Sequence, residues 1–192
     1  DSAYSFVERQ VNFGPRVPNT AAHKACGNYL VCELKRRGAE VYQQNMTLSA
    51  YDKTALESLN VIGSFNPENQ KRILLFAHWD SRPYADHDPN PTKYKTPIDG
   101  ADDGASGVGV LLEVARQLSL KSPEVGIDIV FFDAEDYGTP EFVDKYIPDT
   151  WCLGSQFWAK NPHVPNYKAD FGILLDMVGA KDATFYKEYT SM

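Results

Sequence analysis

The chain has 192 residues, 43% of them hydrophobic and 23% charged, which fits a single folded domain and excludes the disordered and low-complexity classes. Its 19 Lys and Arg residues against 26 Asp and Glu residues give a net charge of −7. We therefore expect neither nucleic acid nor an anionic membrane surface as a partner, because both require clustered positive charge. No stretch approaches the roughly 18 apolar residues of a membrane-spanning helix, so we expect no membrane span.

The first third of the chain predicts one helix followed by two strands. Asn19 or Thr20 can cap a helix that runs to about Arg37, since apolar residues recur there at helical spacing. Residues 40–49 and 54–64 have the composition of strands.

Three continuous apolar runs, at residues 72–77, 126–132 and 171–175, are typical of strands that are buried on both faces. A helix with regularly spaced apolar residues is expected at 105–120, between the first two strands. A strand–helix–strand order with buried strands predicts an α/β fold, in which helices flank a mostly parallel or mixed central sheet.

Each of these three strands leads to an acid or a histidine. The first leads to His78 and Asp80, the second to Glu135 and Asp136, and the third to Asp176. Ligands of open α/β sheets bind at the carboxyl ends of the strands. The sequence therefore predicts a functional site at this edge of the sheet.

A glycine-rich turn at residues 100–107, which contains Asp103, opens the predicted helix at the same edge. So many carboxylates would repel one another unless a divalent cation neutralised them, and histidine plus carboxylates without thiolates favours zinc or a similar metal. Glu135 and Asp136 should point in different directions, so one can bind metal while the other acts as a general base. The alternative interpretation is that each acid caps a helix or pairs with an arginine.

These residues, taken in order, resemble the zinc exopeptidase superfamily, which contains co-catalytic aminopeptidases and animal-type glutaminyl cyclases. The resemblance lies in four segments, His78-x-Asp80-Ser81 and residues 100–107, 131–136 and 174–176. Residues 13–18 and 176–180 are similar to the glutaminyl cyclase branch, and residues 78–83 to its bacterial members. The resemblance implies a three-layer sandwich.

The resemblance also implies a role for each site residue. Asp103 and Asp136 would be zinc ligands, although the family often has Glu in place of Asp136, and Glu135 would be the general acid/base. In the aminopeptidases two zinc ions bind, Asp103 bridges them, and His78 and Asp176 complete the second metal site. In the cyclases one zinc ion suffices, and Asp176 belongs to a hydrogen-bond network near the scissile amide.

Three further residues have expected roles near the site. Asp80 would orient His78 through a hydrogen bond. Trp79 or Trp151 could form a wall of a glutamine pocket, and packing in the core is the alternative for either side chain.

The sequence departs from the family pattern in one respect. The family supplies its remaining zinc histidine from a segment well beyond Asp176, whereas this sequence ends at Met192. His87 and His163 are available, but neither matches the family motif and both are expected in loops. We therefore expect residues 1–192 to form a single α/β catalytic domain that lacks its C-terminal part.

Three functions remain open. The first is a zinc-dependent glutaminyl cyclase that converts N-terminal glutamine to pyroglutamate and releases ammonia. The second is a zinc aminopeptidase, which is favoured by the peptidase-like Ala105-Ser106-Gly107 after Asp103. The third is a non-catalytic binding domain or an inactive fragment, which is favoured by the missing histidine. The resemblance implies peptide or protein N-termini as substrates and a periplasmic or secreted location, and we expect a monomer.

Overall fold

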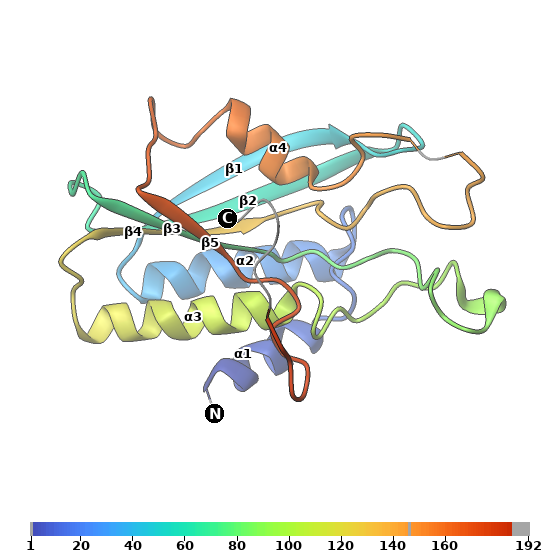
Figure 1. The fold of residues 1–192 in the computed structure, drawn as a ribbon, viewed down its shortest axis with the longest axis horizontal. Coiled ribbons are helices and arrows are strands. Elements are labelled where there is room, and N and C mark those ends of the chain that lie inside the picture. Colours follow the sequence, from blue (N-terminus) through green and yellow to red (C-terminus); the bar gives the residue numbers. More distant parts are fainter. Residues whose placement is uncertain (1, 146, 186–192) are drawn as a thin grey trace.

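The computed structural model describes residues 2–145 and 147–185, in which a five-stranded sheet lies between helices (Figure 1). The strands are β1 Glu40–Ser49, β2 Ala55–Phe65, β3 Arg72–His78, β4 Gly126–Phe132 and β5 Phe171–Leu174. Their order across the sheet is β1-β2-β4-β3-β5. The pairs β3/β4 and β3/β5 are parallel, whereas β1/β2 and β2/β4 are antiparallel, which confirms the expected α/β fold with a mixed sheet.

Helices cover both faces of the sheet. They are α1 Ser2–Val11, α2 Ala21–Arg36, α3 Ala105–Leu120 and α4 Leu153–Lys160, with a short 3-10 turn at Pro91–Lys93. In Figure 1, α2 and α3 lie below the sheet, α1 lies against α3, and α4 lies above the sheet. Within residues 2–145 and 147–185, none of the helices combines the length and the apolar character needed to cross a membrane.

The predicted elements of the first third are present. The Thr20 side chain accepts a hydrogen bond from the His23 backbone N–H at 3.2 Å, so this threonine caps α2. Strands β1 and β2 form an antiparallel hairpin within one residue of the predicted bounds. Helices α1 and α4 were not predicted from the sequence.

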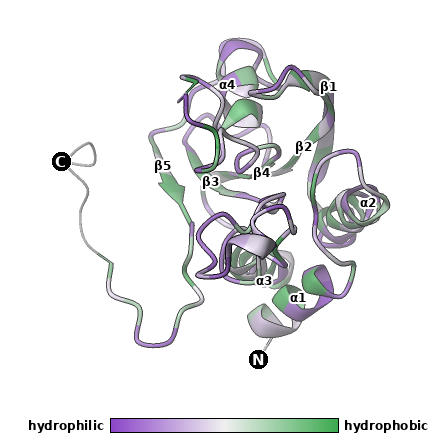
Figure 2. Ribbon diagram, turned by 90° about the vertical axis from the view of Figure 1, so that its right-hand side faces the viewer, coloured by the Kyte–Doolittle hydropathy of each residue, from purple (hydrophilic) through white to green (hydrophobic). Residues whose placement is uncertain are grey.

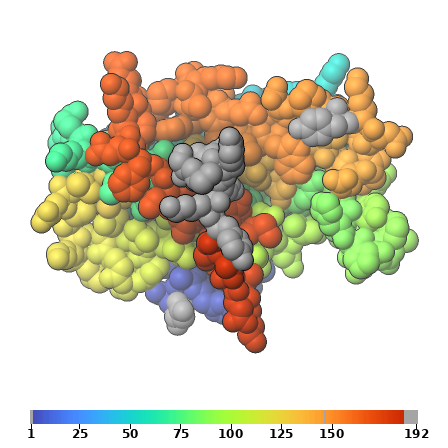
Figure 3. Space-filling view, viewed as in Figure 1, coloured from blue at the N-terminus to red at the C-terminus, as the bar shows by residue number. Residues whose placement is uncertain are grey.

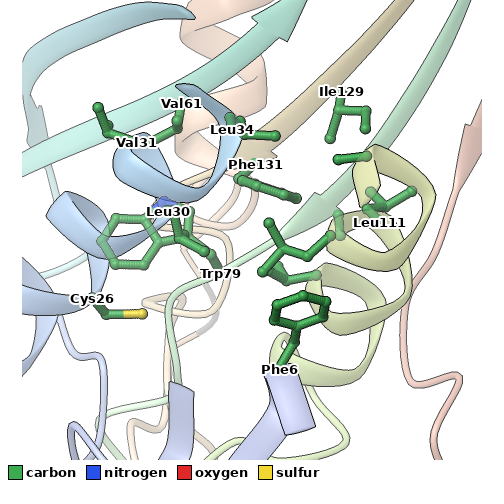
Figure 4. Packing of buried hydrophobic residues seen from close by; sticks show 14 of the residues in the cluster. Phe6, Cys26, Leu30, Val31, Leu34, Val61, Trp79, Leu111, Ile129 and Phe131 are labelled. Carbon is green, nitrogen blue, oxygen red and sulfur yellow. The ribbon is translucent and has the colours of Figure 1, made fainter. Parts of the chain in front are cut away.

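The main core lies between the sheet and the helices α2 and α3. Figure 4 shows Leu30 and Leu34 of α2, Leu111 of α3 and Phe131 of β4, which belong to one buried cluster with Trp79. A second cluster lies on the α4 side, where Ile62, Val130 and Phe132 pack against Trp158. Strand β4 is therefore buried on both faces, as predicted from its continuous apolar run.

The prediction that the third apolar run is buried on both faces is wrong for the described residues. Strand β5 pairs only with β3, so it forms an edge of the sheet, visible on the left in Figure 2. Phe171, Ile173 and Leu174 are 53%, 46% and 55% exposed. The apolar run is present, but no described element packs over it.

Two long segments leave the sheet at the carboxyl ends of the central strands. Residues 79–104 follow β3, and residues 133–152 follow β4. Both extend to the right in Figure 1 and form the green and orange surfaces on the right of Figure 3. All the acids expected in the site lie on these segments or directly after β5.

Candidate active site

His78, the last residue of β3, is the centre of a buried polar cluster. Its Nε2 atom lies 2.8 Å from Asp103 Oδ1 and 3.6 Å from Asp176 Oδ1, and its Nδ1 atom lies 3.3 Å from Asp80 Oδ1. Burial would lower the pKa of His78, but the hydrogen bonds with these carboxylates outweigh burial and raise it well above its ordinary value. One ligand atom from each of His78, Asp103 and Asp176 lies within 4.8 Å of the other two, a spacing that can hold a cation.

Asp80 joins the ends of β3 and β4. Its carboxylate is fully buried, and its two oxygens accept hydrogen bonds from the backbone N–H groups of Glu135 and Asp136, both at 3.1 Å. Burial would raise the pKa of Asp80, but its bonds with His78 and with these N–H groups hold it below its ordinary value. Asp80 therefore contacts His78, as expected, and also fixes the backbone of the two acids.

Glu135 follows a strained turn at the end of β4. Ala134 has a φ of +49°, which is uncommon for a residue other than glycine and redirects the chain after the strand. Glu135 Oε1 accepts a hydrogen bond from the Cys152 thiol at 3.2 Å, and Oε2 lies 4.0 Å from His78 Nδ1. Burial raises the pKa of Glu135, which suits a group that exchanges protons near neutral pH.

Asp136 is a buried carboxylate among other negative charges. Its Oδ1 atom lies 3.3 Å from Arg82 Nη1, whereas its Oδ2 atom is buried and has no hydrogen-bond partner among the described residues. The pKa of Asp136 is raised to about 8. Burial is the largest cause, and the charges of Asp80, Asp103 and Glu135 add to it. An orphaned carboxylate oxygen, excess negative charge and a histidine together fit zinc.

Arg16 holds the turn that carries Asp103, and sequence reasoning missed it. The guanidinium is fully buried and donates to three backbone carbonyls, those of Trp79 at 3.1 Å, Asp99 at 2.5 Å and Gly100 at 2.7 Å. It therefore ties the residue after β3 to the turn before α3. In the sequence, Arg16 stands out only because it belongs to residues 13–18, which are similar to the glutaminyl cyclase branch.

The chain after Asp176 is fixed on the start of α3. The Val178 N–H donates to Ser106 Oγ at 3.0 Å, and the Gly179 N–H donates to Asp102 Oδ1 at 2.8 Å. These two bonds hold Asp176 at the edge where His78 lies.

The two tryptophans differ in position. Trp79 is fully buried, stacks on His23 at 4.3 Å between ring centroids and donates to the Leu59 carbonyl at 3.0 Å. It belongs to the core, so the hypothesis that it walls a glutamine pocket is wrong. Trp151 is partly exposed and its ring lies 4.6 Å from the Arg82 guanidinium carbon, beside Asp136.

Neither of the loop histidines joins the cluster. His163 Nδ1 accepts a hydrogen bond from Trp158 Nε1 at 3.2 Å, and its ring packs against Trp158 of α4 and against Tyr167. His87 is exposed in the segment after β3. His78 lies with Asp80, Asp103, Glu135 and Asp176, whereas His23 Nε2 lies 2.9 Å from Asp133, the first residue after β4.

A cavity of about 710 Å³ lies away from this cluster. It lies between α2 and the β1–β2 hairpin, and its lining includes His23, Lys24, Gln43 and Ser58. None of the acids around His78 lines it. We place the candidate site at the His78 cluster because the charges and the orphaned oxygen converge there.

Comparison with solved structures gives close matches. A Zn-dependent exopeptidase from Parabacteroides distasonis ATCC 8503 is 73% identical, with a TM-score of 0.98, and a glutaminyl cyclase from Tannerella forsythia is 69% identical, with a TM-score of 0.97. Each match covers 99% of this chain and 65% of the other chain. The fold described above is therefore shared with both proteins.

Comparison with curated proteins and with family models agrees. The glutaminyl-peptide cyclotransferase of Drosophila melanogaster is 28% identical over 181 residues, which cover 90% of this chain and 47% of that protein. The chain thus spans about half the length of this curated relative. The model of Peptidase family M28 matches residues 60–192, which include every acid of the cluster. The chain belongs to Peptidase family M28.

Proposed function

We propose that this protein is a zinc-dependent glutaminyl-peptide cyclotransferase, which converts N-terminal glutamine to pyroglutamate and releases ammonia. The observation that carries the proposal is the 69% identity to the Tannerella forsythia glutaminyl cyclase over 99% of the chain. The acid–base environment of Glu135 supports it.

The metal ligands of this chain would be Asp103 and Asp136. Zinc, when bound, polarises the side-chain amide carbonyl of the substrate and stabilises negative charge on its oxygen. His78, held by Asp80, either orients Asp103 through its 2.8 Å hydrogen bond or binds a second metal ion itself.

Glu135 would move the proton. Its carboxylate takes a proton from the attacking α-amine as the new N–C bond forms at the side-chain amide carbon. It then passes this proton to the amide nitrogen, whose C–N bond breaks to release ammonia. The raised pKa of Glu135 favours both transfers near neutral pH.

Asp176 and Trp151 would position the substrate. The Asp176 carboxylate is 41% exposed and can accept a hydrogen bond from the substrate amide while it contacts His78. The partly exposed ring of Trp151 would form a wall of the glutamine pocket.

A zinc aminopeptidase is the second candidate. The observation that favours it is the grouping of His78, Asp103 and Asp176 within 4.8 Å, since the family resemblance assigns this trio to the second metal ion of the co-catalytic aminopeptidases. One bound zinc ion therefore supports the cyclase, two support the aminopeptidase, and none supports a non-catalytic role.

Substrate source, location and assembly follow from the resemblance alone. We propose peptide or protein N-termini as substrates, a periplasmic or secreted location and a monomeric state.

The test is ammonia release from a glutaminyl dipeptide, run beside hydrolysis of an aminoacyl anilide. We expect ammonia release by the wild-type protein and its loss in Glu135→Gln, which keeps its zinc because Glu135 is not a ligand. Glu141→Gln, an exposed glutamate on the same segment, is the matched control and should retain activity. Anilide hydrolysis without ammonia release would show that the protein is an aminopeptidase and not a cyclase. Loss of zinc in Glu135→Gln would show that Glu135 is a metal ligand.

A further inference from the structure

Arg82 has a fixed orientation in the segment after β3. Its side chain is 8% exposed, and it makes two parallel hydrogen bonds with Asp86, Nε to Oδ1 at 2.7 Å and Nη2 to Oδ2 at 2.5 Å. A bidentate pair of this kind sets the plane of the guanidinium. The remaining nitrogen, Nη1, is thereby aimed at the turn after β4.

Nη1 of Arg82 holds Asp136 at two points. It donates to the Asp136 backbone carbonyl at 3.1 Å and to Oδ1 of the same residue at 3.3 Å. The Asp136 N–H is held by Asp80 at 3.1 Å. The backbone and one carboxylate oxygen are therefore fixed. The other oxygen, Oδ2, is buried and has no hydrogen-bond partner within residues 2–145 and 147–185.

The Arg82–Asp86 pair is itself anchored to the segment that follows β4. Asp86 Oδ2 accepts a hydrogen bond from the Glu141 backbone N–H at 2.9 Å. The Trp151 ring lies over the Arg82 guanidinium at 4.6 Å and directly against Gly138, where a Cβ atom would overlap the indole. Asp136, near the start of this segment, and Trp151, near its end, therefore both contact Arg82.

The charge of Arg82 does not oppose a cation at Asp136. A free guanidinium so close to a metal ligand would repel the metal, but the Asp86 carboxylate neutralises it through the bidentate pair. With its charge neutralised, Arg82 acts on Asp136 mainly through a directional hydrogen bond.

We propose that Arg82 is a positioning residue, which fixes Asp136 so that its Oδ2 atom faces the metal, with Asp86 as its counter-charge. The inference rests on the proposed function in so far as Asp136 is a zinc ligand there. Hydrogen-bond partners of metal ligands contribute about 10–100-fold to metal affinity.

The test measures the zinc Kd of the purified protein by competition with a chromogenic chelator, together with the Tm of the zinc-free protein. We expect Arg82→Gln to raise the Kd by about 10–100-fold. Arg116→Gln, which removes a partly exposed arginine paired with Glu113 on α3, is the control and should leave the Kd unchanged.

Arg82→Lys separates positioning from general stabilisation, and it serves if Arg82→Gln does not fold. Lysine keeps the charge but cannot bond Asp86 bidentately and Asp136 at the same time, so the Kd should still rise. A Kd equal to that of the wild type in Arg82→Lys, with only the zinc-free Tm lowered, overturns the proposal. If the variants bind zinc more weakly but the wild-type protein releases no ammonia, the positioning role of Arg82 stands and the cyclase function is rejected.

Discussion

Two glycines with almost the same φ lie in different surroundings. Gly104, at the start of α3, has a φ of +88°, and Gly38, after α2, has a φ of +84°. A Cβ atom at Gly104 would lie 2.7 Å from the Asp80 carbonyl oxygen and 3.0 Å from the His78 ring, whereas one at Gly38 would meet nothing within 4 Å. Of these two glycines, Gly104 is the one that lets the turn with Asp103 approach His78 and Asp80.

We predict that Gly104→Ala and Gly38→Ala share one effect and differ in another. Both lose about 1 kcal/mol of unfolding free energy, because alanine is strained at positive φ. Gly104→Ala should lose more, because its Cβ would lie 2.7 Å from the Asp80 carbonyl oxygen. Only Gly104→Ala should also weaken zinc binding, since the added methyl group displaces Asp80 or His78. Urea unfolding and the zinc Kd measure the two effects. Equal zinc affinity in both variants would show that the close approach at Gly104 does not matter for the metal.

At the scale of elements, a buried ion pair joins the starting ends of the central strands. Asp128 of β4 is fully buried and accepts two hydrogen bonds from Arg72 of β3, both at 2.7 Å, one from Ser64 of β2 at 2.6 Å and one from Tyr167 at 2.8 Å. Burial would raise the pKa of Asp128, but these bonds outweigh it and lower the pKa from its ordinary value.

This pair makes stability depend on acid pH. A carboxyl group with a lowered folded pKa stabilises the protein above its ordinary pKa of about 3.9, and the contribution is lost as the pH falls through the folded value. We predict that Asp128→Asn lowers the unfolding free energy at pH 7 by about 3–5 kcal/mol, because Arg72 loses its counter-charge.

As the pH is lowered from about 5 to about 2, the unfolding free energy of Asp128→Asn should fall less than that of the wild type. Urea unfolding at each pH measures this difference. Asp170→Asn, which changes an exposed carboxylate near β5, is the control and should follow the wild-type curve. Parallel curves for Asp128→Asn and the wild type would contradict the assignment.

At the scale of the whole molecule, the layers place the negative charge at one edge of the sheet. Three parallel strands end there, and their following segments bring Asp80, Asp103, Glu135 and Asp176 around one histidine. The charges of Asp80, Asp103 and Glu135 also act on Asp136. Mutual repulsion of these carboxylates opposes folding unless a cation or a proton neutralises part of the charge.

We therefore predict that zinc stabilises the entire fold. Chelation should lower the Tm, and free zinc at 100 times its Kd should add about 2.7 kcal/mol of unfolding free energy, since binding to the folded state alone acts by mass action. The double variant Asp103→Asn, Asp136→Asn should show no zinc-dependent shift. A Tm that is insensitive to chelator in the wild type would count against a metal in this cluster.

The sequence by itself determined the elements that depend on short-range patterns. The apolar runs of β3 and β4 identified the central strands, and the Thr20 cap and the spacing of apolar residues identified α2 and α3. The acids at the strand ends were found because parallel strands deliver the residues that follow them to one edge. These features are readable because neighbouring residues in the chain produce them.

The tertiary structure decided which partner each polar group meets. Arg16 reaches Gly100 across 84 positions of the chain and Arg82 reaches Asp136 across 54, and neither pairing has a local signal. Packing also placed Trp79 in the core. Among the residues that the structure describes, Asp136 Oδ2 has no hydrogen-bond partner and β5 has a neighbouring strand on one side only. Periodicity and capping are local properties of the sequence, but burial and long-range hydrogen bonds depend on how the helices and strands pack together, which only the assembled fold specifies.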